Sequence, residues 1–190
     1  GAVGLSAFSG IYASSPSSVW SVGSNLTLNN ASGFNLVNPI SVAGSTTLTA
    51  GAGIGDITLD NATNNLNNVT VTSGRDVTIE SAYNVGGVTI DLPRAAGRLR
   101  DVTITYPGAN VAIGNASGND AAMSGNLSLT SGGTITQWNG YLNLNGALST
   151  SSFTAGGNIT LNSGSNYLGA VTVNPATDTL SVDLYNNSGN

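Results

Sequence analysis

The chain has 190 residues, and 7% of them are charged, against about 25% in an average soluble domain. It contains no cysteine, histidine or lysine, which excludes disulfides, cysteine-based zinc sites and catalytic triads built on histidine. A net charge of −5 with four arginines does not suit nucleic-acid binding, which needs many cations against the phosphates.

Short alternating triplets follow one another along the chain from residue 23 to residue 182. Each triplet is apolar, small polar, apolar, which is the two-residue period of a β-strand. Glycine, asparagine and aspartate separate the triplets and favour tight turns. In chain order the triplets are Leu26–Leu28, Ile40–Val42, Ile57–Leu59, Val69–Val71, Val77–Ile79, Val88–Ile90, Val102–Ile104, Val111–Ile113, Leu127–Leu129, Leu142–Leu144, Ile159–Leu161, Val171–Val173 and Leu180–Val182. Residues 1–22 and 183–190 show weaker periodicity, and we expect irregular segments or partial coils there.

Apolar positions recur about every 20 residues, which is typical of a β-solenoid. One coil cannot bury its apolar edges alone, whereas stacked coils place neighbouring strands about 4.8 Å apart and share one core. The sequence therefore predicts an all-β, right-handed parallel β-helix with coils of about 20 residues. The expected inward row is Leu28, Leu48, Val71, Ile90, Ile113, Leu129, Leu148 and Val171.

A longer repeat underlies the triplets. Residues 56–71 read DITLDNATNNLNNVTV and residues 158–173 read NITLNSGSNYLGAVTV, with half of the sixteen positions identical at an offset of 102 residues. About five coils of 20 residues would fill this offset. We therefore expect two copies of a block that contains several coils.

One stretch interrupts the pattern, between Asp91 and Asp101. It contains three of the four arginines, Arg94, Arg98 and Arg100. We expect an insertion or an irregular corner, with two alternatives for its arginines. The favoured alternative is an exposed loop in which they pair with Asp91 and Asp101, and the other is that they contact an anionic polysaccharide or a neighbouring chain. Residues 114–124 are a second candidate loop.

Two pairs of acids are spaced for adjacent coils: Asp56 with Asp76, and Asp60 with Glu80. Carboxylate pairs of this kind serve glycoside hydrolysis in some enzymes. The second block has asparagine at the positions of Asp56 and Asp60, however, and interchange of Asp and Asn suits a turn. We therefore expect no catalytic residues, no cofactor and no metal. Outward Thr-x-Thr pairs also occur, but their spacing does not predict a regular array.

Three phrases of the sequence resemble repeats of the filamentous haemagglutinin family, which are large bacterial exoproteins exported by the two-partner route. The phrases are GDITLDNATNNL (residues 55–66), GNLSLTSGGTITQ (125–137) and TAGGNITLN (154–162), and the resemblance covers about residues 23–174. It implies a right-handed parallel β-helix, a location on the outer surface of Gram-negative bacteria, and adhesion or biofilm cohesion. Autotransporter passengers share this fold and are alternative relatives.

These features together favour the structural and adhesive shaft of a secreted bacterial surface adhesin, located outside the cell. The expected partners are like chains or extracellular polysaccharide, with no nucleic acid and no membrane-spanning segment. Two alternatives stay open: a polysaccharide-active enzyme on the same fold, and a subunit that polymerises end to end into an extracellular filament.

Overall fold

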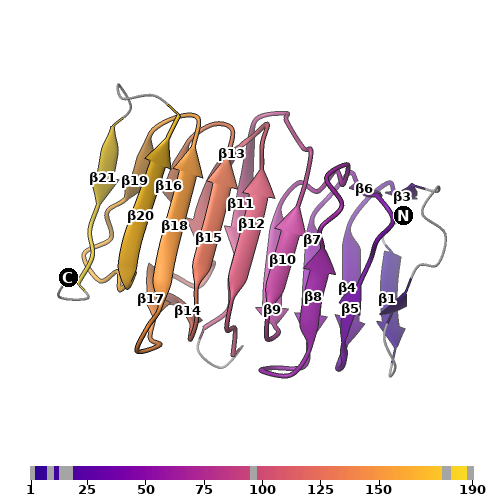
Figure 1. Cartoon of the computed structure of the whole chain (residues 1–190). Helices are drawn as coiled ribbons and strands as arrows, with labels where there is room; N and C mark the ends of the chain where they lie inside the picture. The colour runs from indigo at the N-terminus through magenta and orange to yellow at the C-terminus, as the bar shows by residue number, and fades with distance from the viewer. Residues whose placement is uncertain (1–2, 8–10, 13–18, 95–97, 177–180, 188–190) are drawn as a thin grey trace.

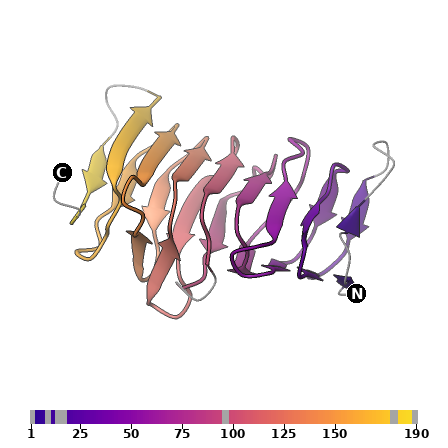
Figure 2. The same ribbon diagram turned by 60° about the horizontal axis from the view of Figure 1, so that its bottom comes forward.

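The computed structural model describes residues 3–7, 11–12, 19–94, 98–176 and 181–187, and every regular element in them is a β-strand. All the strand pairs are parallel, and the coils advance along one axis from the N-terminus to the C-terminus (Figures 1 and 2). No helix in the described part of the chain is long and apolar enough to cross a membrane. The protein is a parallel β-solenoid, as the sequence predicts.

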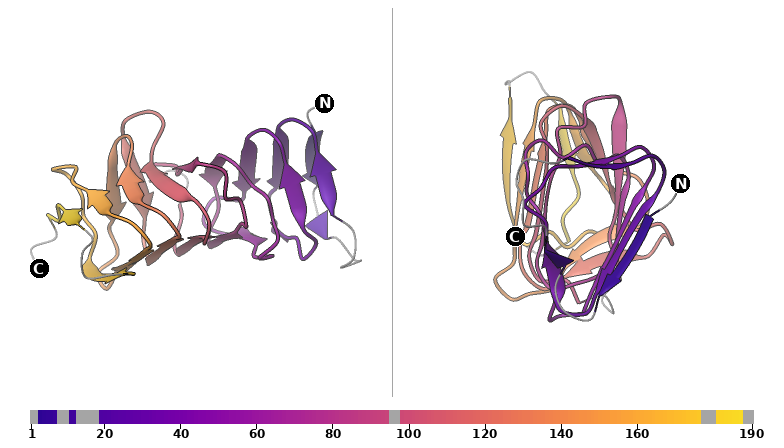
Figure 3. Two further views of the ribbon diagram at one scale, coloured as in Figure 1. Left: turned by 90° about the horizontal axis from the view of Figure 1, so that it is seen from above. Right: turned by 90° about the vertical axis from the view of Figure 1, so that its right-hand side faces the viewer.

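Two long sheets face each other along the whole solenoid. Sheet 1 contains β1 (Val3–Ala7), β4 (Leu26–Asn30), β7 (Thr46–Ala50), β9 (Val69–Ser73), β11 (Gly87–Asp91), β13 (Asn110–Gly114), β16 (Ile135–Gln137), β19 (Ile159–Leu161) and β21 (Val182–Leu184). Sheet 2 contains β2 (Ile11–Tyr12), β5 (Gly33–Asn35), β8 (Asp56–Leu59), β10 (Val77–Glu80), β12 (Val102–Tyr106), β15 (Leu127–Ser131), β18 (Thr150–Ala155) and β20 (Ala170–Pro175). Viewed down the axis, the coils superimpose as a closed ring (Figure 3).

A third wall closes each coil between the two sheets, and it changes sides along the chain. In the N-terminal half it contains β3 (Trp20–Val22) and β6 (Ile40–Val42), and the chain runs from sheet 1 to sheet 2 to this wall. In the C-terminal half it contains β14 (Asp120–Met123) and β17 (Tyr141–Leu144), and the chain runs from sheet 1 to the wall to sheet 2. The two walls therefore lie at opposite edges, the upper and the lower edge in Figure 1.

The change of side takes place within one coil. The upper wall ends at residues 81–83, where the Ala82 amide donates a hydrogen bond to the carbonyl of Asn64. The lower wall begins in the interruption that the sequence indicated, where Leu99 pairs with Met123. Residues 92–94 and 98–101 thus connect β11 to β12 as the first turn of the lower wall, and residues 120–123 of the second expected loop form strand β14.

The coils are longer than the sequence spacing predicts, at about 23 residues each. The step from Leu26 to its partner Thr46 is a short one, and the step from Val77 to Val102 is a long one. The added length lies between the strands, in turns such as residues 92–94 and 98–101, which carry no apolar triplet.

This added length displaces part of the expected inward row. The prediction is right at Leu28, Leu48 and Val71, which stack in successive coils of sheet 1. It is wrong at Leu148, which is 93% exposed. Phe153 pairs with Leu129 in its place.

The internal repeat spans four and a half coils rather than five. From Ile57, four pairing steps along sheet 2 lead to Ser151, and the next crossing leads to Ile159 in sheet 1. Ile57 and Ile159 are the two residues that the 102-residue offset aligns. The second copy of the repeat therefore begins on the sheet opposite to the first.

Two buried asparagines confirm that the copies are structurally equivalent. The side chain of Asn64 accepts a hydrogen bond from the Ile40 amide at 2.9 Å and donates one to the Leu59 carbonyl at 3.0 Å. The side chain of Asn166 accepts one from the Leu142 amide at 2.8 Å and donates one to the Leu161 carbonyl at 2.9 Å. Both residues are fully buried at the entry to the third wall, so their amides replace water for the backbone there.

One hydrophobic core runs from Val22 to Leu168, because the outer residues of the triplets from Leu26–Leu28 to Ile159–Leu161 point inward. Of the last triplet, Leu180 lies outside the described residues and Val182 is 42% exposed. In β4, for example, Leu26 and Leu28 are buried while Thr27 is exposed. The middle residues form outward rows. On sheet 2 this row is in register over six coils, and its members are Thr58, Thr78, Thr103, Ser128, Ser152 and Thr172. The outward hydroxyls are thus more regular than their spacing predicts.

The N-terminal segment continues this architecture. Within residues 1–22, which we expected to be irregular or a partial coil, β1 pairs with β4 and β3 pairs with β6. At the other end, β21 pairs with β19 and extends sheet 1 to Leu184.

Candidate functional site

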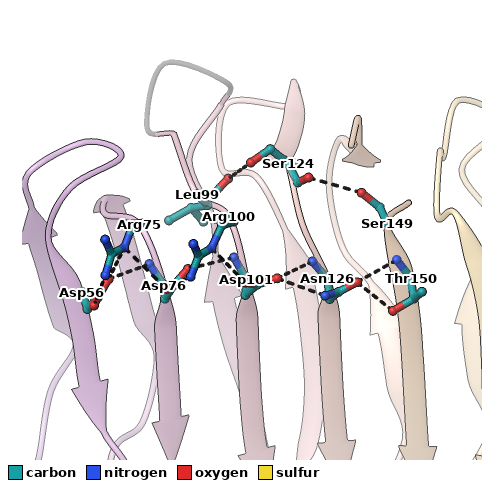
Figure 4. A network of polar contacts seen from close by, with 10 residues as sticks. All are labelled: Asp56, Arg75, Asp76, Leu99, Arg100, Asp101, Ser124, Asn126, Ser149 and Thr150. Atoms are coloured by element: carbon teal, nitrogen blue, oxygen red, sulfur yellow. Dashed lines mark hydrogen bonds and ion pairs between the residues drawn. The ribbon is translucent and has the colours of Figure 1, made fainter. Parts of the chain in front are cut away.

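A ladder of polar side chains follows the edge of the solenoid where the strands of sheet 2 begin, which is the lower edge in Figure 1. Figure 4 shows this ladder from close by, with the strands running downward from it. Its members are Asp56, Asp76, Asp101, Asn126 and Thr150, one from each successive coil. Each of the first four accepts a hydrogen bond from the backbone amide of the next, for example Asp101 from Asn126 at 2.8 Å. Because side-chain oxygens at the same corner of each coil bind the next coil, the ladder holds the coils in register.

Two arginines join the charged part of this ladder. Arg75 binds Asp56 through two parallel hydrogen bonds, of 2.8 Å from Nε and 2.6 Å from Nη2. Arg100 binds Asp76 in the same way and also donates to Asp101 at 3.0 Å. The hydrogen bonds from Arg75 hold the pKa of Asp56 below its ordinary value of 3.8, against an opposing effect of burial.

The arginines that the sequence grouped together separate in the structure. Arg94 is 3.4 Å from Asp120, on the first strand of the lower wall. Arg100 belongs to the ladder, and one of its partners is Asp101, as the loop alternative predicted. Arg98 is exposed and forms no ion pair or hydrogen bond with the described residues.

Arg98 also has an unusual backbone. Its φ angle is 53°, the left-handed region that non-glycine residues rarely adopt. Its side-chain carbons lie over Gly53, in the turn between β7 and β8, where an added Cβ would be 3.3 Å from the Cδ of Arg98. Glycine at position 53 therefore leaves room for the arginine stem to cross the neighbouring corner.

A cleft of about 480 Å³ opens where the short corner turns meet the first turn of the lower wall. Arg75, Arg98 and Arg100 line it together with Gly53, Ser124 and Asn145, and the buried residues Leu99, Ala122 and Met123 lie beneath its floor. No acidic residue is among the described residues that line it. The change of side of the third wall thus produces a polar, arginine-lined notch on the surface of the solenoid.

The sequence identified two of these three arginines. Arg75 was missed as part of this group because it lies a full coil before Arg98, and a sequence alone does not show which corner turns are neighbours. One feature of the sequence could have indicated that Arg75 belongs to this group. Arg75 directly precedes Asp76, which lies one coil after Asp56. Arg94, in contrast, does not line the cleft.

The acid pairs lie side by side, as their spacing predicts. Asp76 donates its amide to Asp56 at 3.3 Å, and Asp60 and Glu80 directly follow the paired residues Leu59 and Ile79. Asp56 and Asp76 each form an ion pair with an arginine, and these ion pairs are part of the ladder between the coils. Among the described residues, no group of three or more acids is placed to hold a metal ion.

These features define a class, the repeat proteins with a parallel β-solenoid fold. A family model described as repeats of unknown function (DUF5649) matches residues 17–73 and 99–174, which is more than half of the chain. The chain belongs to this repeat family. Neither the curated proteins nor the solved structures contain a match. The two matched stretches correspond to the two halves of the solenoid, and the segment between them holds Arg75, Arg94 and Arg98.

Proposed function

We propose that this solenoid is the structural and adhesive shaft of a secreted bacterial surface adhesin, which mediates attachment of the cell surface or cohesion of a biofilm. The observation that carries the proposal is the unbroken stacking of parallel coils on one core, with both long sheets continuing through the change of side. Every coil adds backbone hydrogen bonds to its neighbours on both sheets, so the stability of the shaft against unfolding grows with the number of coils.

The surface of the solenoid supports a role in contact with like chains or extracellular polysaccharide. Only 7% of the residues are charged, and four described acids are already bound by arginines. The outward row on sheet 2 presents hydroxyls in register over six coils. Long-range repulsion between such faces is weak, so two shafts can approach closely.

The test is to locate the protein in the cells that produce it and to remove it. Antibodies against the purified chain are applied to intact and to permeabilised cells, and attachment and cell aggregation are compared between the parent strain and a gene deletion. We expect labelling of intact cells and reduced attachment in the deletion, restored by complementation. Labelling that requires permeabilisation, or unchanged attachment and aggregation, would overturn the proposal.

A further inference from the structure

We propose that the arginine-lined cleft is a binding site for one acidic sugar residue, a hexuronate within a polysaccharide chain. The cleft, the guanidinium of Arg98 and its strained backbone carry the inference. It goes beyond the proposed shaft function, because it concerns one site at the junction of the two halves and is measurable on the purified chain.

The cleft has the donors that a carboxylate needs. Arg75 and Arg100 use Nε and Nη2 for the ladder, and their Nη1 groups donate no hydrogen bond to the described residues. The guanidinium of Arg98 has no partner in the described part of the chain. Guanidinium groups bind carboxylates through paired, charge-assisted hydrogen bonds, so a carboxylate beside Arg98 has a second and a third arginine within the same cleft.

The local charge suits a ligand that presents one negative charge to the cleft. Arg75 and Arg100 are accompanied by three carboxylates, those of Asp56, Asp76 and Asp101, and Arg98 brings this cluster to neutrality. The one guanidinium without a partner suits one carboxylate in the cleft, whereas a densely sulfated or phosphorylated sugar would bring several charges to the same place. A sugar with one carboxylate per ring satisfies both conditions.

The remaining lining residues suit a sugar ring. Ser124 and Asn145 supply a hydroxyl and an amide for the ring hydroxyls. The volume of about 480 Å³ lies within the range of small-ligand sites, which is about 300–1,000 Å³.

The backbone of Arg98 indicates that the position is held in place by its surroundings. A left-handed non-glycine residue costs free energy, and such residues cluster at functional sites where the neighbouring structure imposes the conformation. Leu99, the next residue, is buried and pairs with Met123, and Arg98 packs over Gly53. The backbone of Arg98 is therefore held in place before a ligand arrives, with the stem of its side chain over Gly53 at the cleft.

Calorimetric titration of the purified chain with oligogalacturonate, against a neutral oligosaccharide of equal length, tests the proposal. Arg98→Gly removes the guanidinium while glycine adopts the left-handed backbone freely, so this variant keeps the fold. Arg98→Gln keeps a long side chain, and Arg94→Gln is the matched control, with the same charge change outside the cleft. We expect oligogalacturonate to bind, both Arg98 variants to weaken binding about tenfold or more, and Arg94→Gln to change it less than about twofold.

Each other outcome overturns the proposal. Absence of binding, or equal binding by the Arg98 variants, would remove Arg98 as the ligand contact. Equal binding of the neutral oligosaccharide would show that the carboxylate of the ligand is not recognised. Equal displacement by acetate would show that the cleft binds small anions without recognising a sugar. Heparin binding more tightly than oligogalacturonate would contradict the argument from single charge. None of these results depends on where the cell places the protein.

Discussion

The two halves of the solenoid use the same sequence block in opposite places. In the N-terminal half the block leads from sheet 2 through the upper wall to sheet 1, with Asn64 buried at the wall. In the C-terminal half it leads from sheet 1 through the lower wall to sheet 2, with Asn166 buried there. A repeat of four and a half coils requires this exchange, which shows that the two sheets of the ring are interchangeable for this block.

The largest expected effect tests this equivalence at the buried asparagines. Asn64→Ala and Asn166→Ala each leave several buried backbone groups without a hydrogen-bond partner, so we expect each to lower the free energy of unfolding by about 3 kcal/mol. Urea unfolding followed by circular dichroism measures it, and Asn65→Ala, at an exposed neighbouring position, is the control. A loss at one position without the other would show that the halves are not equivalent.

The short corners sharpen the comparison, because they lie at opposite edges in the two halves. A Cβ at Gly132 would overlap the carbonyl oxygen of Pro107, whereas a Cβ at Gly74 has its nearest neighbour at 3.4 Å. We expect Gly132→Ala to lower the free energy of unfolding by about 2–3 kcal/mol and Gly74→Ala to change it by less than about 0.5 kcal/mol. Thermal unfolding of both variants checks this, and equal melting temperatures would contradict the packing of the Gly132 corner.

The next prediction concerns Tyr106, which lies at the upper edge where the two halves meet. Tyr106 ends strand β12, one coil after the upper wall ends at residues 81–83. Burial raises the pKa of the Tyr106 hydroxyl above its ordinary value of 10.0. The folded state therefore holds this proton more tightly than the unfolded state. The contribution of the protonated Tyr106 hydroxyl to the free energy of unfolding is complete below pH 10. This contribution is lost as the pH rises above 10, at up to about 1.4 kcal/mol per pH unit.

Urea unfolding at a series of alkaline pH values measures this loss, and Tyr106→Phe is the matched variant. We expect the variant to lose the part of the alkaline dependence that Tyr106 causes and to retain the stability of the parent near neutral pH. The same alkaline slope in both proteins would mean that other groups cause it.

The smallest expected effect compares the charged and the neutral part of the ladder. The pKa of Asp56 lies below its ordinary value of 3.8 in the folded protein. The ionised carboxylate therefore stabilises the folded state above pH 3.8, and this stabilisation is lost as the pH falls through the pKa of Asp56 in the folded protein. Asp56→Asn should lower stability at pH 7 by about 0.5 kcal/mol and reduce the acid dependence, because exposed ion pairs contribute little.

Asp60→Asn is the control for this change, since Asp60 is exposed and has no ion pair among the described residues. Asp101→Asn makes that rung like Asn126 and should be tolerated in the same range. A loss of several kcal/mol for Asp56→Asn would mean that the Arg75 pair is far more important than its exposure indicates.

The sequence predicted the strands well because their signal is local. Leu26, Thr27 and Leu28 alternate in the pattern that a half-buried strand requires, and the structure buries the two leucines. It predicted the coil length less well, because the number of residues in the turns between the strands follows no apolar period. Leu148 was placed in the core from spacing alone, whereas the longer turn after β17 leaves it exposed.

The candidate site was half visible in the sequence. Arg98 and Arg100 stood out because they interrupt the triplets, and the family resemblance added an expectation about adhesion that stays a prediction. Which arginines share a cleft depended on the stacking of corners that lie one coil apart in the chain. This stacking joined Arg75 to the group and left Arg94 outside it.

The sequence by itself determined that the chain is all-β, that its strands stack as coils, and that a block recurs after 102 residues, since alternation and repetition are properties of the order of residues. Only the tertiary structure decided which edge of the ring carries the third wall and where that edge changes. A half-integral number of coils places equal sequences on opposite sheets, and the mismatch between the two edges is what opens the cleft at Arg98.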